Sequence, residues 1–153
     1  MEKVSWWEAI AFCEKLRGKS DRGFRLLSEA EWEYACRAGT ETPFYFGETI
    51  STEQVNHNQH YKQTTDVGIF PPNSFGLYDM HGNVWEWCAD HWHPNYNGAL
   101  KDGSAWKTSN DKDSRLLRGG SWVSNPDGCR SAYRLLNSPD IQSGGIGFRV
   151  ACS

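Results

Sequence analysis

Asp79-Met80-His81-Gly82-Asn83-Val84-Trp85-Glu86-Trp87 is the densest stretch of the chain in acidic, turn-forming and aromatic residues. Asp79 and Glu86 offer carboxylate oxygens, and Gly82 allows a turn that points main-chain carbonyls inward. Hard oxygen ligands on a turn suit Ca²⁺. The same residues also suit a tight turn whose carboxylates cap main-chain amides. The residues alone favour the capped turn and leave a cation site open.

The composition of the whole chain narrows the fold class. Its 153 residues are the size of one domain. Only 38% are hydrophobic and the mean hydropathy is -0.70, yet 14% are aromatic, with eight Trp and fifteen Gly. The shortage of aliphatic residues argues against a helical bundle, and the aromatic residues argue against disorder. We therefore expect a loop-rich α+β or β domain with an aromatic core.

Charge and hydropathy exclude several kinds of partner. The net charge is -3 and no basic patch stands out, so we expect no nucleic-acid partner. No apolar run approaches the length of a membrane span, and no secretion leader opens the chain. These features predict a cytoplasmic protein without a membrane partner.

The cysteines are widely spaced and form no C-x-x-C pair, which argues against a zinc ribbon. Their number is odd, so at least one has no disulfide partner within the chain. In a cytoplasmic protein we expect buried, reduced thiols. The five residues are Cys13, Cys36, Cys88, Cys129 and Cys152.

Two short helices are predicted near the start of the chain. Ser5-x-x-Glu8 and Ser28-x-x-Glu31 are capping boxes, each followed by apolar residues at helical spacing, and Gly18 and Gly39 end the two runs. Beyond Gly39, frequent Gly and Pro leave room for short elements only. We expect strands at 78–80, 84–88, 116–122 and 147–152, and a long surface loop at 93–114.

Three further groups of residues are candidate sites, each with a structural alternative. Arg118-Gly119-Gly120 could bind an anion, but a strand bulge beneath a Trp is favoured. A group of charged residues could hold an acidic ligand, but a buried ion-pair network is favoured; its members are Arg130, Arg134, Arg149, Asp127 and Asp140. The histidines could bind a metal, but their spacing favours surface loops; they are His57, His60, His81, His91 and His93.

Several long motifs together resemble one family, the formylglycine-generating enzymes, also called the sulfatase-modifying-factor domain. The motifs are Arg25-Leu26-x-Ser28 to Tyr34, Pro71 to Trp87, Arg118 to Trp122, Arg130-Ser131-Ala132 and Gly147-Phe148-Arg149. The resemblance implies an α+β, C-type-lectin-like fold that is loop-rich, with two short helices and small twisted antiparallel sheets. It also implies a single domain over residues 1–153, which could be the C-terminal part of a longer protein.

The resemblance implies two metal sites and a pattern of disulfides. The family's structural calcium site falls on Asp79, Gly82, Val84 and Glu86. The copper-binding cysteine pair of the enzymes falls on Ser124 and Cys129, so one of the two thiolates that soft Cu(I) favours is missing. We therefore expect a protein that is not an enzyme. Disulfides between Cys13 and Cys152 and between Cys36 and Cys129 are also implied.

Residues 116–152 resemble the variable region of proteins that are diversified by retroelements. Changing the adenines of an Asn codon cannot give Lys, Glu, Gln, Met or Trp, and between Val123 and Ile146 only Gln142 belongs to that set. A Gly- and Ser-rich surface loop could have the same composition. The implied framework includes 118–122, 129–132 and 147–151, and was expected not to touch the ligand. The implied variable, ligand-binding positions are Val123, Ser124, Gly128, Tyr133, Leu135, Leu136, Ile141, Ser143, Gly144 and Gly145.

Three hypotheses for the function follow. The first is a display module that binds an unidentified protein or other macromolecule through these positions. The second is a copper-dependent, oxygen-dependent oxidase acting on a sulfatase cysteine, with Cys129 as its surviving thiolate. The third is a non-catalytic accessory domain of a larger enzyme.

Overall fold

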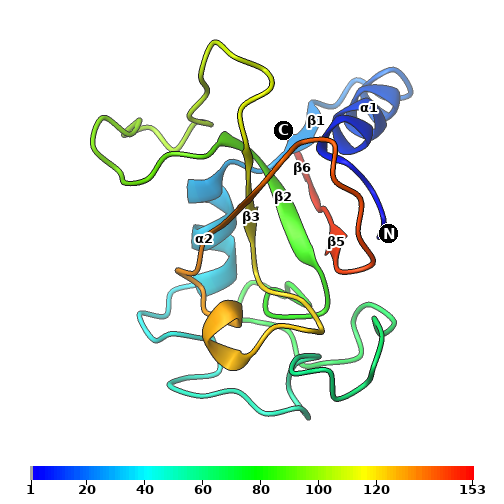
Figure 1. The fold of residues 1–153 in the computed structure, drawn as a ribbon, viewed down its shortest axis with the longest axis vertical. Helices are drawn as coiled ribbons and strands as arrows, with labels where there is room; N and C mark the ends of the chain where they lie inside the picture. The colour runs from blue at the N-terminus through cyan, green and yellow to red at the C-terminus, as the bar shows by residue number, and fades with distance from the viewer. Residues whose placement is uncertain (1) are drawn as a thin grey trace.

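The computed structural model describes residues 2–153, which form two small sheets and two helices joined by long loops (Figure 1). Four strands make a central sheet in the order β4-β3-β2-β5, and two more make the pair β1-β6. The elements are α1 (Trp6–Arg17), β1 (Phe24–Leu26), α2 (Glu29–Arg37), β2 (Trp85–His91), β3 (Arg115–Arg118), a 3-10 turn (Pro126–Cys129), β4 (Leu135–Asn137), β5 (Ile146–Gly147) and β6 (Val150–Cys152).

Both helices begin at the predicted capping boxes. Ser5 Oγ accepts the N–H of Glu8, and the Glu8 carboxylate accepts the N–H of Ser5 at 2.7 Å. Ser28 and Glu31 make the same reciprocal pair at the start of α2. These bonds satisfy main-chain donors that a helix start otherwise leaves without partners. The helix prediction is therefore confirmed, although α2 is capped by Ala38 rather than by Gly39.

The strand predictions were right in part. The predicted strand at 84–88 is the first part of β2, but 78–80 is not a strand, because Asp79 has a left-handed φ of 56° and turns the chain. The predicted strand at 116–122 ends at Arg118, since Gly119 and Gly120 have φ values of 97° and 78°. A Cβ on Gly119 would lie 3.0 Å from the Trp32 ring, which confirms that the backbone passes close beneath a Trp. The irregularity in strand register lies elsewhere, between Trp87 and His91 of β2.

The predicted strand at 147–152 belongs to two sheets. β5 pairs with β2, and β6 pairs with β1. The β2–β5 pair is parallel, so the expectation of purely antiparallel sheets was wrong and the central sheet is mixed. The chain between β2 and β3 forms a long loop without helix or strand, as predicted for 93–114.

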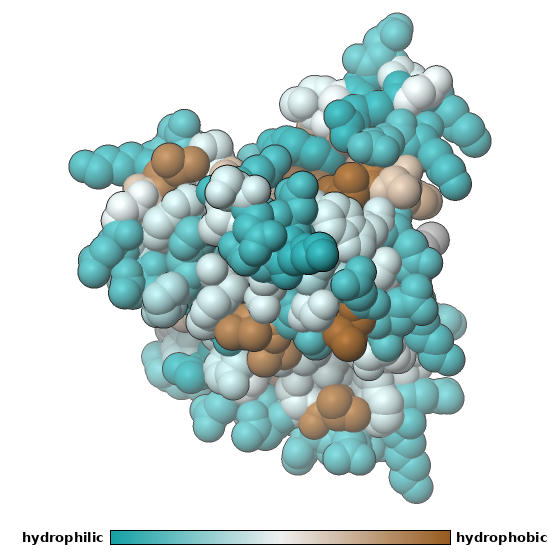
Figure 2. Space-filling model, turned by 45° about the horizontal axis from the view of Figure 1, so that its top comes forward, coloured by the Kyte–Doolittle hydropathy of each residue, from teal (hydrophilic) through white to brown (hydrophobic). Residues whose placement is uncertain are grey.

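Strand alternation gives the central sheet two chemically different faces. On the face toward α1, Trp87 and Leu117 pack with Trp6 in an apolar cluster. On the face toward α2, Cys88 and Leu116 belong to a second apolar cluster with Trp32 of α2. Glu86 and Arg118 are buried on the same face. On the side of the molecule in Figure 2, apolar residues form isolated patches among hydrophilic ones, consistent with the low mean hydropathy.

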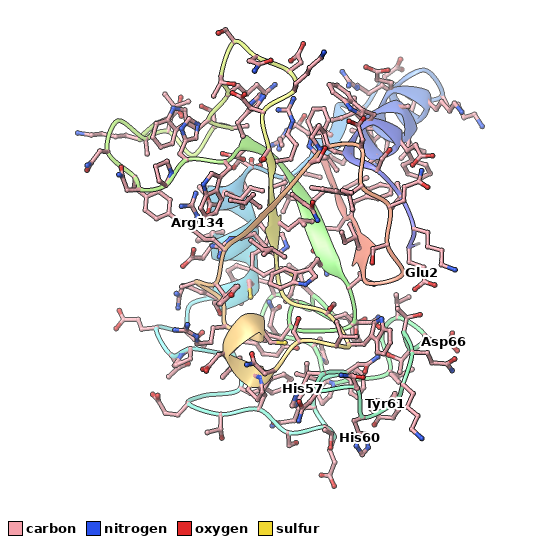
Figure 3. The ribbon with its side chains drawn as sticks, in the orientation of Figure 1. Glu2, His57, His60, Tyr61, Asp66 and Arg134 are labelled. Carbon is pink, nitrogen blue, oxygen red and sulfur yellow. The ribbon has the colours of Figure 1, made fainter. Side chains whose placement is uncertain are left out.

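Three arginine–glutamate pairs join the α2 face of the sheet to its surroundings. Arg134 binds Glu29 with two bonds of 2.6 and 2.9 Å, and Figure 3 shows Arg134 on this side of the sheet. Arg118 pairs with Glu33, and Arg149 pairs with Glu86. The predicted buried network is therefore present, but its partners are glutamates rather than Asp127 and Asp140.

Arg130 lies outside this network. Its side chain is 46% exposed, and its Nε lies 3.9 Å from a carboxylate oxygen of Asp127. An exposed pair at this distance contributes little to stability.

All five cysteines are free thiols, so the implied Cys13–Cys152 and Cys36–Cys129 disulfides are corrected. Cys36 Sγ instead donates to the carbonyl of Met80 at 3.7 Å. The expectation of buried, reduced thiols holds for every cysteine except Cys152, which is exposed.

The expectation that the histidines lie on surface loops was wrong for His57, His81 and His91, which are buried. The ring of His81 is hydrogen-bonded on both sides, donating from Nδ1 to the carbonyl of Cys129 at 2.7 Å and accepting the N–H of Tyr45 at Nε2. Burial lowers the pKa of His81 to about 4.

His91 and His93 do not share one strand face. His91 ends β2 and contacts the Arg115 guanidinium at 2.9 Å, whereas His93 stacks on Trp106 in the following loop. The two rings therefore have different partners and form no metal-binding pair.

Acid should destabilise the fold through His81. Because the folded-state pKa is about 4 and the unfolded one is about 6.5, the stabilisation is complete above the unfolded pKa and is lost as the pH falls toward the folded one. Between about pH 7.5 and about pH 5, His81 should cost about 2 kcal/mol of unfolding free energy. Urea titrations at the two pH values measure it, and His81→Gln should show a pH dependence smaller by that amount. An unchanged pH dependence in His81→Gln would contradict this role.

Candidate functional site

A groove of about 440 Å³ lies where the turn after β3 meets β4 and the segment before β5. It brings together six of the ten predicted ligand-binding positions, which come from three segments between residues 123 and 145. They are Val123, Leu135, Ile141, Ser143, Gly144 and Gly145. The remaining lining residues are Trp85, Ser121, Trp122, Asn137 and Ile146.

The turn that forms one wall of the groove is held in place by main-chain hydrogen bonds. Trp122 donates its N–H to the carbonyl of Asn83 at 2.9 Å and accepts the N–H of Gln59 at 2.7 Å. Asn58 donates to the carbonyl of Ser124 at 2.8 Å. The side chain of Val123, 48% exposed, is left free at the groove.

The opposite wall is set by strand alternation in β4. Leu135 and Asn137, two residues apart, both line the groove, whereas Leu136 between them does not. Leu136 is 43% exposed. It therefore offers a matched position outside the groove on the same strand.

Four predicted positions lie outside the groove lining. Ser124 Oγ accepts the N–H of Ser121 at 3.0 Å, and Gly128 is buried against the Ser124 side chain. Tyr133 packs on Trp85, with 5.9 Å between the ring centroids. Leu136 faces away, as described above.

Part of the lining differs from the prediction. Ser121 and Trp122 were predicted to be framework that does not touch a ligand, but both line the groove. Asn137 could have been found from Leu135 by the two-residue period of a strand, had a strand been predicted there. Nothing local in the sequence places Trp85 beside them.

The positions of the family's copper ligands do not fit a copper site here. Cys129 is fully buried, and its Sγ would lie 2.6 Å from a Cβ on Gly120. Burial raises the pKa of Cys129 to about 12, so the sulfur is a thiol at neutral pH. Its expected partner is a serine, Ser124, and a hydroxyl is a poor ligand for Cu(I).

Three of the four implied calcium ligands, Asp79, Val84 and Glu86, line a second pocket of about 380 Å³. Gly82 is not among its lining residues and packs against Val55 and Asn56. Both oxygens of Glu86 are bonded to Arg149, at 2.7 and 2.8 Å. Asp79 Oδ2 accepts the N–H of Gly68, its Oδ1 is buried without a partner, and burial raises the pKa of Asp79. Ca²⁺ takes six to eight oxygen ligands, and the carboxylate that would supply two of them is occupied by Arg149. Calcium binding, which the resemblance implies, would require Arg149 to release Glu86.

Within residues 2–153, no helix is both long and apolar enough to span a membrane. No group of three or more His, Cys, Asp or Glu side chains in that range is arranged to hold a metal ion. His57 and His60 lie in the loops beyond one end of the sheet (Figure 3), and neither belongs to such a group.

Comparison with known proteins shows three informative similarities. The chain is 34% identical over 170 residues to the formylglycine-generating enzyme of Mus musculus, covering 97% of this chain and 42% of that protein. Its fold matches PvdO from Pseudomonas aeruginosa with a TM-score of 0.92 and 41% identity, over 99% of this chain and 60% of that one. It also matches Treponema denticola variable protein 1 with a TM-score of 0.83 and 29% identity, over 99% and 70% of the two chains.

The whole chain also matches a model of one protein family. The chain spans less than half the length of the mouse enzyme. The family that matches is the sulfatase-modifying factor enzyme 1-like domain, over residues 1–153. The fold and the motifs agree with that match, and the chain belongs to this family, the family of the formylglycine-generating enzymes.

Proposed function

We propose that the chain is a ligand-binding module of this family, and that the groove binds a macromolecular ligand. The observation that carries the proposal is that six positions expected to vary converge on one groove of about 440 Å³. A volume of this size lies within the range of small-molecule sites and is large enough to receive a side chain of a larger ligand. The similarity to a protein named as a variable protein supports the same proposal.

We also propose that residues 116–152 are the variable region of the module. The groove positions in that region include exposed apolar side chains, of which Val123 is 48% and Ile141 is 41% exposed. Exposed apolar side chains at the centre of a groove are suited to contacts with a protein. The ligand is therefore proposed to be a protein.

The oxidase is the second candidate, because the mouse relative is named as a formylglycine-generating enzyme. Against it stand the serine at 124 and the buried, protonated thiol of Cys129. An accessory domain of a longer protein remains compatible with the binding role, since a binding module can be part of a larger chain.

Crosslinking tests the binding role directly. The photoreactive residue p-benzoylphenylalanine is placed at Val123, in the groove, or at Leu136, outside it and similarly exposed. In cells of the source organism, a discrete crosslinked product is expected from position 123 and not from position 136. Excess wild-type protein should suppress this product, whereas excess Ile141→Glu should not. Equal products from both positions, or none from position 123, would overturn the proposal.

Copper binding separates the module from the oxidase. Because Cys129 is buried and protonated, we expect no Cu(I) binding at neutral pH that depends on this residue. Anaerobic titration against a colorimetric Cu(I) chelator compares the wild type with Cys129→Ala, and a sulfatase-derived cysteine peptide is checked for oxidation by mass spectrometry. Copper uptake lost in Cys129→Ala, or oxidation of the peptide cysteine, would favour the oxidase.

Calcium can be tested by thermal unfolding. Because Arg149 already neutralises Glu86, we expect about 1 mM Ca²⁺, the weak end of calcium affinities, to leave the melting temperature unchanged relative to EDTA. A rise of several degrees in the wild type that is absent in Asp79→Asn would instead establish the calcium site implied by the family. Mg²⁺ at the same concentration controls for ionic strength.

A further inference from the structure

The groove differs from the other pockets of the molecule in carrying no charge. Its lining consists of six apolar residues, two serines, two glycines and one asparagine. Three other pockets each have at least three charged residues in their lining. Of the whole chain, 23% of residues are charged. A lining without charged residues therefore favours an uncharged ligand group.

The neutrality has a structural cause in strand alternation. In β2, Trp85 faces the groove, and Glu86 next to it points to the α2 side, where it binds Arg149. At the start of β4, Leu135 lines the groove, and Arg134, the residue before it, binds Glu29 of α2. The residue-by-residue alternation thus directs the charges of both strands away from the groove.

The polar side chains of the lining include donors that have no partner. Asn137 Oδ1 already accepts the N–H of Ser138, and Ser143 Oγ accepts that of Gly145. The side-chain N–H groups of Asn137 and Trp122 have no hydrogen-bond partner among residues 2–153, and Trp122 Nε1 lies 3.9 Å from where a Cβ on Gly145 would be. A ligand with a carbonyl oxygen would satisfy these donors.

Resting on the proposed binding function, we infer that the groove takes an uncharged apolar side chain of a protein ligand, with a main-chain carbonyl of that ligand accepting from Trp122 or Asn137. A charged side chain would lose its hydration there without gaining an ion-pair partner among the lining residues. An apolar one gains burial against Trp85, Leu135 and Ile141.

Amide-capped amino acids are the probes, because they present one side chain beside a carbonyl. The indole N–H signals of ¹⁵N-labelled protein are followed by NMR, with Trp85 and Trp122 assigned by substitution. N-acetyl-phenylalaninamide or N-acetyl-leucinamide should shift these signals saturably at concentrations up to about 50 mM, the weak affinity expected of fragments. The lysine and aspartate analogues and methyl α-glucoside should not shift them.

Ile141→Glu and Leu136→Glu form a matched pair, because the two side chains are 41% and 43% exposed and only Ile141 lines the groove. Ile141→Glu should weaken binding of the apolar probe about tenfold or more, and Leu136→Glu should not. Val123→Glu repeats the test if Ile141→Glu does not fold.

Stronger shifts with a charged probe or the sugar would overturn this inference but leave the binding function standing. Absence of any shift would overturn the inference, while the binding function would be judged separately by the crosslinking at Val123.

Discussion

The buried carboxylate of Glu86 connects three parts of the chain, namely α2, β2 and the C-terminal segment. It lies in β2 and is 5% exposed. Its Oε2 accepts from Trp32 Nε1 of α2 and from Arg149 Nε, both at 2.7 Å. A buried carboxylate is stable only when such partners replace its hydration. The helix, the central strand and the C-terminal segment must therefore meet at this group, and that meeting places β5 and β6 on either side of Arg149.

This constraint also separates charge across the sheet. The glutamates of α2 bind Arg118 and Arg134, so these ion pairs of the sheet lie on the α2 side. The lining of the groove has no charged residue, and the α1 side is aromatic and aliphatic except for the buried Arg115, whose guanidinium lies 3.9 Å from the centre of the Trp6 ring. The many Trp and few aliphatic residues of the composition fit this division, because indole rings fill the small core and also donate hydrogen bonds, as Trp6 does to the carbonyl of Cys88.

Local signals in the sequence predicted the helices and the centre of the sheet. Ser5 and Ser28 act on residues three positions away, so their capping boxes can be recognised without the fold. Half of the groove lining could be anticipated only through a family resemblance. The other parts of the fold depend on contacts between residues that are distant in the sequence, such as the bond of His81 to the carbonyl of Cys129. No short-range sequence pattern predicts such contacts. The implied disulfides also depend on distant contacts: Cys13 is buried whereas Cys152 is exposed, and Cys36 Sγ contacts the carbonyl of Met80.

The way in which the turn at 121–124 is attached has an evolutionary consequence. The bonds that connect it to Asn58, Gln59 and Asn83 use main-chain atoms only. Any residue except proline supplies the same N–H and carbonyl groups. The position of Val123 therefore does not depend on which side chain stands there. Val123 can therefore be replaced during evolution without loss of the bonds that hold the turn. The same three main-chain bonds to the neighbouring loops keep the scaffold stable and allow the exposed residue to vary.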